Sequence, residues 1–244
     1  MKAGSGRRLG VVLAVPAILG VSGGVFAQSA YGPGGMMVHP SALVRGKGET
    51  TAGLSWFRQE RSGVGNEWSP FTVVAGIDGK SEVGVQWVRR VTRGGSADNG
   101  GLFAKVRLLE PSDGRPALAL VASHVGGPIS LTSFSLASTW TVPGAPDGTL
   151  VHAGLQWAQR ADLSPRRSDT QPYLGVQIPV AQRLNALAEV GSKFAFDPKA
   201  RLGLGLSWTT PGGPQVTGGV VNIGRSDNPG LFFGVGYPIG GGKR

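Results

Sequence analysis

Apolar residues alternate with small or polar residues along most of the chain from about residue 49 onward. Between residues 81 and 91, Val83, Val85 and Trp87 share one face, and polar or small residues occupy the other face. A repeat of two residues is the period of a β-strand whose two faces meet different surroundings. The same alternation recurs in four further stretches: 101–110, 148–160, 170–180 and 199–209.

Turn-forming clusters divide this patterned region into about twelve strands. We expect them near residues 49–60, 69–78, 81–91, 101–110, 115–125, 129–141, 148–160, 170–180, 184–195, 199–209, 214–225 and 230–239. Most approach the roughly 9–11 residues that a tilted membrane strand needs. The sequence therefore predicts an all-β fold, an antiparallel transmembrane β-barrel over residues 49–239 with about 12 strands and a range of about 10–14.

Four strands end in the same pattern of Gly, an aliphatic residue, a polar residue and Trp. The copies end at Trp56, Trp87, Trp157 and Trp208. Outward aromatic residues at strand ends form the girdles of membrane barrels, and we add Tyr237 of the last strand to this set. Longer connections follow the first three copies and predict an external rim there. Trp208 falls on a strand of the opposite direction, so either the pattern serves both rims or a further strand lies near residues 191–196.

Charge is scarce on the predicted strands and dense in their connections. Charged residues make up 16% of the chain, against roughly 25% in soluble domains. The polar faces carry mainly Gly, Ser, Thr and Gln. A soluble β-sandwich or barrel also alternates, but its polar face is usually rich in Lys, Glu and Asp. The composition favours the membrane barrel, and a soluble secreted β-protein that binds a ligand stays the alternative.

Six charged residues fall on the predicted inner face of the barrel. They are Glu82, Lys105, Arg107, Glu189, Lys193 and Arg201. Four are basic and two acidic, so at most two simple pairs can form. Since buried charges are normally paired or solvated, the basic residues in excess of these pairs predict water inside the barrel or contact with a loop or ligand. Twelve strands predict a narrow, partly filled lumen.

The chain ends predict export to the cell envelope. Lys2, Arg7 and Arg8 precede a short apolar run and a small-residue cleavage site at Ala27, so residues 1–27 are expected to be a cleaved signal peptide. Residues 28–48 are rich in Gly and Pro and are expected to form a leader, and residues 240–244 a short basic tail. The expected location is the outer membrane of a Gram-negative envelope.

The sequence predicts no catalytic residue, no metal site and no cofactor. The chain has no Cys, and its three histidines lack ligand spacing. Residues 79–81 resemble the end of a phosphate loop, but Val74 stands where the first Gly belongs, and a hairpin turn explains them better. His152 could be the catalytic histidine of a lipid hydrolase, but the alternation along its strand places it on the luminal face rather than the lipid face. An enzyme is therefore not expected, and an outer-membrane lipid hydrolase barrel is kept as an alternative.

Two segments carry resemblances to known families. The end of the last strand, with Gly234, Tyr237 and Ile239, resembles the C-terminal assembly signal of bacterial outer-membrane proteins. Residues 39–48 and 172–179 are similar to parts of the exopolysaccharide-associated outer-membrane barrel family. Membership would imply a role linked to polysaccharide export or the cell surface, with no catalytic residues.

These observations predict a structural or narrow-pore barrel of the outer membrane. Its expected partners are outer-membrane lipid, lipopolysaccharide contacted by arginines near the external girdle, and the barrel assembly machinery. Small solutes or polysaccharide are the expected cargo. Nucleic acid is not an expected partner, because export and the absence of a continuous basic patch argue against it.

Overall fold

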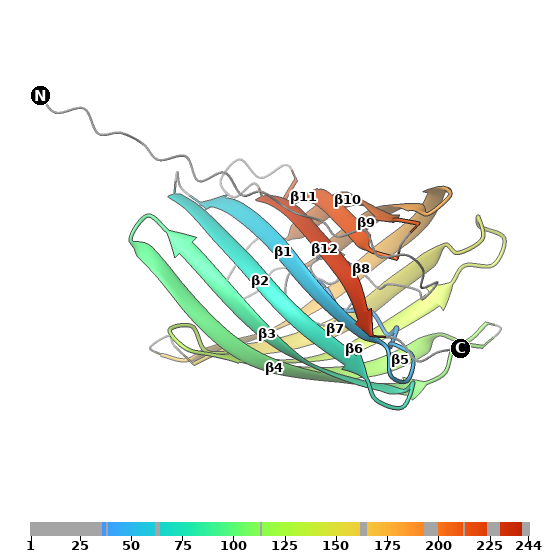
Figure 1. Ribbon diagram of the computed structural model, residues 1–244, viewed down its shortest axis with the longest axis horizontal. Coiled ribbons are helices and arrows are strands. Elements are labelled where there is room, and N and C mark those ends of the chain that lie inside the picture. Colours follow the sequence, from blue (N-terminus) through green and yellow to red (C-terminus); the bar gives the residue numbers. More distant parts are fainter. Residues whose placement is uncertain are drawn as a thin grey trace, which may run out of the picture.

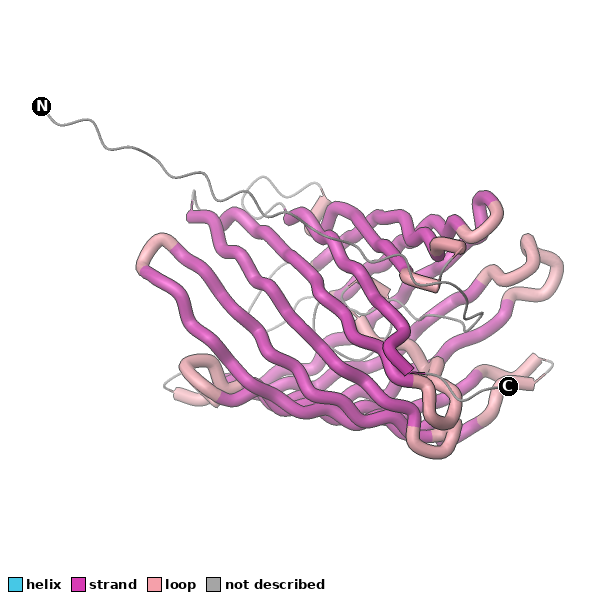
Figure 2. Tube along the Cα trace, in the orientation of Figure 1, coloured by secondary structure: helices cyan, strands magenta, loops and turns pink. Residues whose placement is uncertain are grey.

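The computed structural model describes residues 36–37, 39–61, 64–112, 114–161, 165–192, 200–211, 213–223 and 230–240. The predicted signal peptide and the basic tail after Gly240 lie outside these residues. In the described part of the chain, no helix is long and apolar enough to cross a membrane. Figure 2 shows strands joined by turns and short connections.

The described residues form twelve strands in one closed barrel, which confirms the predicted fold (Figure 1). Each strand pairs antiparallel with its neighbours in the sequence, and β12 closes the barrel against β1. The strands are β1 (Thr50–Arg61), β2 (Val64–Gly76), β3 (Ser81–Thr92), β4 (Gly95–Leu109), β5 (Ala117–Gly126), β6 (Leu131–Thr141), β7 (Leu150–Arg160), β8 (Arg167–Ala181), β9 (Leu184–Gly191), β10 (Arg201–Thr209), β11 (Gln215–Val221) and β12 (Gly230–Gly240).

The outer surface of the barrel is apolar on every strand. One exposed large apolar side chain from each strand, in order, is Leu54, Phe71, Val85, Leu102, Leu120, Leu136, Leu155, Leu174, Val190, Leu204, Val220 and Leu231, with exposed fractions from 41% to 66%. A soluble barrel hides its apolar face, whereas a membrane barrel turns that face to lipid. This arrangement rules out the soluble alternative, because the exposed apolar band encircles the whole wall.

The two rims of the barrel differ in which parts of the chain they carry. The terminal rim is the one where β1 begins and β12 ends, and the connections after even-numbered strands lie there. The distal rim carries the connections after odd-numbered strands. The sequence predicts that the terminal rim faces the periplasm and the distal rim faces outward.

Two connections that the sequence suggested were long are hairpins of extended strands. β1 runs to Arg61 and β2 begins at Val64, while β3 runs to Thr92 and β4 begins at Gly95. The polar residues beyond the apolar band continue the ladder, because backbone hydrogen bonds do not require apolar side chains. Opposite charges also face each other in register, Arg58 with Glu67 and Arg89 with Asp98, which favours pairing over a loop.

The segment that resembles a phosphate loop is the turn between β2 and β3. Asp78 Oδ1 accepts hydrogen bonds from the backbone N–H groups of Lys80 (2.9 Å) and Ser81 (2.6 Å). These bonds, led by the one from Lys80, hold the pKa of Asp78 below its usual value. Gly79 takes φ of 81°, which a glycine adopts without strain. The hairpin-turn prediction is confirmed.

The strand count also answers the question raised by Trp208. β9 and β10 pair directly with each other, so no strand lies between them in the wall. Trp208 therefore stands near the terminal end of β10, whereas Trp56, Trp87 and Trp157 stand toward the distal rim. The Gly–aliphatic–polar–Trp pattern serves both rims.

Candidate functional site: the occupied lumen

The lumen contains the chain segment that precedes β1. We call residues 36–45 the lumen segment; Val38 within it is not described. Its described residues are buried apart from the half-buried Leu43. A turn at the terminal rim brings the chain inward, with Glu49 N–H donating to Gly46 O (3.1 Å) and Gly46 N–H donating to Glu49 Oε2 (2.9 Å). The second half of the predicted leader is thus part of the barrel interior.

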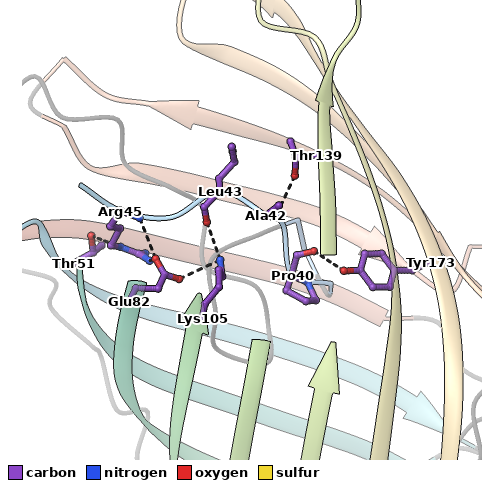
Figure 3. A network of polar contacts seen from close by, with 9 residues as sticks. All are labelled: Pro40, Ala42, Leu43, Arg45, Thr51, Glu82, Lys105, Thr139 and Tyr173. Atoms are coloured by element: carbon purple, nitrogen blue, oxygen red, sulfur yellow. Dashed lines mark hydrogen bonds and ion pairs between the residues drawn. The ribbon is translucent and has the colours of Figure 1, made fainter. Parts of the chain in front are cut away.

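At the terminal end of the segment, Arg45 and two wall residues form a buried cluster that we call the charge junction (Figure 3). Glu82 Oε2 accepts hydrogen bonds from Arg45 Nη1 (3.0 Å) and from the Arg45 backbone N–H (3.2 Å). Glu82 Oε1 lies 3.1 Å from Lys105 Nζ. The three side chains are at most 1% exposed. Such charge-assisted contacts are short and directional, so they fix the segment against β3 and β4.

Two further contacts extend the charge junction along the segment. Lys105 Nζ donates to Leu43 O at 2.9 Å, and Arg45 Nε donates to Thr51 Oγ1 at 3.1 Å. One lysine of the wall therefore binds both Glu82 and the segment backbone. The segment is not one of the strands of the barrel, and contacts of this kind satisfy its buried backbone groups.

The middle of the segment is hydrogen-bonded to β6 and β8. Ala42 N–H donates to Thr139 Oγ1 at 3.0 Å, and Tyr173 Oη donates to Pro40 O at 2.9 Å (Figure 3). Thr139 Oγ1 also lies 3.0 Å from His152 Nδ1 of β7. Small side chains let the segment approach the wall here, since Ala42 packs against Ala117, Ala119 and Ala137.

His39 joins the segment to β8 and β9. Its ring stacks on Tyr173, with ring centroids 4.6 Å apart and planes 13° from parallel. His39 Nδ1 lies 3.4 Å from Glu189 Oε2, and both side chains are at most 3% exposed. The contact is an ion pair only when the imidazole is protonated.

At the far end of the segment, Met36 and Met37 form what we call the methionine anchor. They belong to a buried apolar cluster with Phe57, Leu187, Val221 and Phe232, against which Trp68 packs. The wall is hollowed where they lie. A Cβ at Gly175 would stand 2.7 Å from Met36 Cε, and a Cβ at Gly203 would stand 2.9 Å from Met37 Cε. The flexible thioether side chains fill space that only glycine leaves open.

With the segment in place, inward-facing side chains around the whole wall are buried. Inward-facing side chains from all twelve strands are at least nine-tenths buried; one from each strand, in order, is Ser55, Thr72, Gln86, Lys105, Ala119, Ser135, His152, Gln171, Glu189, Ser207, Thr217 and Phe232. A narrow, partly filled lumen was expected from the strand number. The lumen segment occupies part of this lumen, which the strand number alone does not predict.

The structure brings together some of the predicted luminal charges and leaves others apart. Glu82 and Lys105 meet at the charge junction, and Glu189 meets His39. Arg107 points inward near the terminal rim, where its Nη2 lies 2.9 Å from Glu110 Oε1. Arg201 is half-buried on the inner face of β10, and Lys193 lies outside the described residues. The five predicted girdle aromatics all lie on outward-facing strand positions: Trp56, Trp87, Trp157, Trp208 and Tyr237.

Sequence reasoning missed Arg45, His39 and the methionine anchor as luminal residues. They belong to a segment without strand periodicity, so no repeat placed them on a face. A usable signal was the unbalanced set of luminal charges, which predicted contact with a loop or ligand. The loop is this segment, although Arg45 adds a further positive charge rather than removing one.

The structure gives the lipid-hydrolase alternative no support at His152. Its side chain is 2% exposed, points inward and is bonded to Thr139, so it does not meet lipid. In the described part of the chain, no three His, Asp or Glu side chains are grouped so that they could hold a metal ion.

Comparisons with known proteins identify similar folds but no sequence family. No protein-family model matches the chain, and no curated protein matches it. A KdgM porin in complex with disordered oligogalacturonate has a TM-score of 0.59 at 10% identity, covering 77% of this chain and 98% of that one. The KdgM porin structure gives 0.57 at 10% identity, covering 76% and 98%. The translocator domain of autotransporter NalP from Neisseria meningitidis gives 0.50 at 15% identity, covering 78% and 88%.

These neighbours are bacterial outer-membrane barrels. The similarity confirms the outer-membrane barrel fold, and the apolar band around the wall fits the predicted location in that membrane. The resemblance to the exopolysaccharide-associated family is not confirmed.

Proposed function

We propose that this protein is a narrow-pore barrel of the outer membrane that its own lumen segment keeps closed. The observation that carries the proposal is the set of buried contacts between the segment and the wall, which reach from the charge junction at β3 and β4 to the methionine anchor at β10 and β11. If the segment only filled the lumen, apolar side chains would be sufficient, because a buried ion pair adds little net stability.

The lining of the lumen supports a conducting state once the segment moves. The inner wall carries hydroxyl and amide side chains, including Ser55, Thr72, Ser133, Ser135 and Gln171. Such groups are solvated readily when the segment leaves, whereas an apolar wall would not be. The open state would pass small polar solutes.

Export of a cell-surface polysaccharide is the finer form of this proposal. Hydroxyl and amide groups hydrogen-bond sugar hydroxyls, and one porin of similar fold is described in complex with oligogalacturonate. Lipopolysaccharide and the barrel assembly machinery are proposed as partners on the sequence arguments alone.

Planar-bilayer conductance tests the proposal. We expect the mature protein to show rare, brief openings, and a variant lacking residues 36–45 to show a stable conductance. Heat-modifiable gel mobility identifies preparations in which the barrel is folded. A folded deletion variant that does not conduct would leave the protein a structural barrel and end the narrow-pore proposal.

A further inference from the structure

The charge junction brings two basic side chains to one acidic side chain. Arg45 and Lys105 both form ion pairs with Glu82. Arg107 follows two residues beyond Lys105 on the same face of β4, nearer the terminal rim, with a side chain that is 17% exposed. Basic groups therefore lead from the terminal rim into the buried cluster.

Glu82 fills this cluster as a bound carboxylate would. One oxygen accepts from Arg45 twice, through Nη1 and the backbone N–H, and the other lies against Lys105 Nζ. Arg45 Nη2 is buried and makes no hydrogen bond within the described part of the chain. The cluster thus has a donor to spare beyond those that Glu82 uses.

We propose that the charge junction is a carboxylate-binding site, and that a carboxylate-bearing solute entering from the terminal rim replaces Glu82 at Arg45 and frees the lumen segment. This inference rests on the proposed function and names the class of solute that opens the pore. Exchange of one carboxylate for another retains the charge-assisted hydrogen bonds of Arg45. A neutral solute offers no such exchange, so it cannot favour the open state through this site.

Arg107 is the first contact on this route. Its partner Glu110 is 56% exposed, and exposed ion pairs of this kind are weak. An arriving carboxylate can therefore take the place of Glu110 at Arg107 at little cost. From there it meets Lys105 on the same inner wall and Arg45 on the lumen segment.

The experiment compares trimannuronate, an acidic trisaccharide, with mannotriose, its uncharged counterpart. Each is added to planar bilayers that contain the full mature protein. We expect trimannuronate to raise the open probability and mannotriose to leave it unchanged. Equal responses to the two sugars, or no response to either, would overturn the inference.

Variants locate the effect at the proposed site. Arg107→Gln should raise the half-maximal trimannuronate concentration roughly three- to fivefold, the scale of one partly exposed ion pair. Glu82→Gln removes the internal carboxylate and should tighten trimannuronate binding, measured by calorimetry in detergent, about tenfold. Arg115→Gln is the matched control, because Arg115 is an exposed residue of the β4–β5 connection on the same rim. It should change neither value.

The two proposals can fail separately. If the variant lacking residues 36–45 conducts but the complete protein ignores trimannuronate, the pore stands and the carboxylate site does not. If Glu82→Gln fails to fold, Arg107→Gln still tests the site, and an unchanged half-maximal concentration in that variant would contradict it.

Discussion

The two ends of the lumen segment are held by different physical interactions. At the charge junction, Arg45 is fixed by a few directional contacts that depend on the charge of Glu82. At the methionine anchor, Met36 and Met37 are fixed by shape, because glycines of β8, β10 and β11 leave hollows for them. The first end responds to a change in charge, whereas the second is indifferent to it.

This difference suggests how a segment can be both secure and releasable. Charge-assisted bonds weaken sharply when one partner is neutralised. The stabilisation from dispersion and apolar burial decreases only when the methionine side chains no longer fit the wall. We expect the charged end to leave first and the methionine end to act as the pivot. Since the chain has no Cys, single cysteines can report each end: Val44→Cys for the charged end and Met36→Cys for the anchor.

The largest effect should come from Glu82→Gln. This change removes the carboxylate that Arg45 and Lys105 share, and breaking a buried ion pair costs roughly 3–5 kcal/mol. Labelling of Val44→Cys by a water-soluble maleimide should become about a hundredfold faster or more, with a much smaller change at Met36→Cys. Equal acceleration at both reporters would show that the ends do not act separately.

Met37→Ala tests the other end. Removing a buried methionine side chain costs roughly 2–5 kcal/mol, the lower value applying where the wall can collapse into the space. We expect the labelling of Met36→Cys to accelerate by about thirtyfold and that of Val44→Cys to change little. A larger response at Val44→Cys would mean that the anchor holds the whole segment.

Gly203→Ala tests whether shape alone holds the anchor. The new Cβ would meet Met37 Cε at 2.9 Å and Glu189 Cγ at 3.2 Å. Overpacking of this kind costs about 1–3 kcal/mol, so Met36→Cys should be labelled roughly tenfold faster. Gly100→Ala is the control, since the nearest atom to its Cβ is Trp87 Cε3 at 4.0 Å. If Met36→Cys is labelled at the same rate in both variants, the space at Gly203 does not hold Met37 in place.

The smallest effect should come from Thr139→Val in the middle of the segment. The change removes the acceptor for Ala42 N–H and leaves a buried donor unsatisfied, at about 1–3 kcal/mol. A Ser41→Cys reporter should be labelled about fivefold faster. Thr132→Val on the same strand is the control, because Thr132 bonds His124 on the outer surface. Faster labelling in that control would point to damage in β6 rather than loss of the luminal bond.

The sequence by itself determined the wall of the barrel. Alternation with a period of two sorts each strand into a lipid face and an inner face, because successive side chains point to opposite sides. That rule placed Glu82, Lys105 and His152 inside and Trp56, Trp87, Trp157 and Trp208 outside. It also predicted twelve strands and the hairpin turn at Asp78. The starts of β2 and β4 were placed five or six residues too late, since ladder pairing continues past the apolar band where charges such as Arg58 and Glu67 face each other.

Only the tertiary structure decided what fills the lumen. Arg45 and Glu82 are 37 residues apart, and His39 and Glu189 are 150 apart, so no local pattern joins them. The lumen segment has no strand period, and the backbone groups of Pro40, Ala42, Leu43 and Arg45 bond to side chains of the wall. Its place depends on closure of the barrel, which brings the charges of β3 and β4 and the glycines of β8, β10 and β11 around one chain. A periodic pattern can specify a surface, but the fit of an irregular segment depends on contacts that exist only after folding.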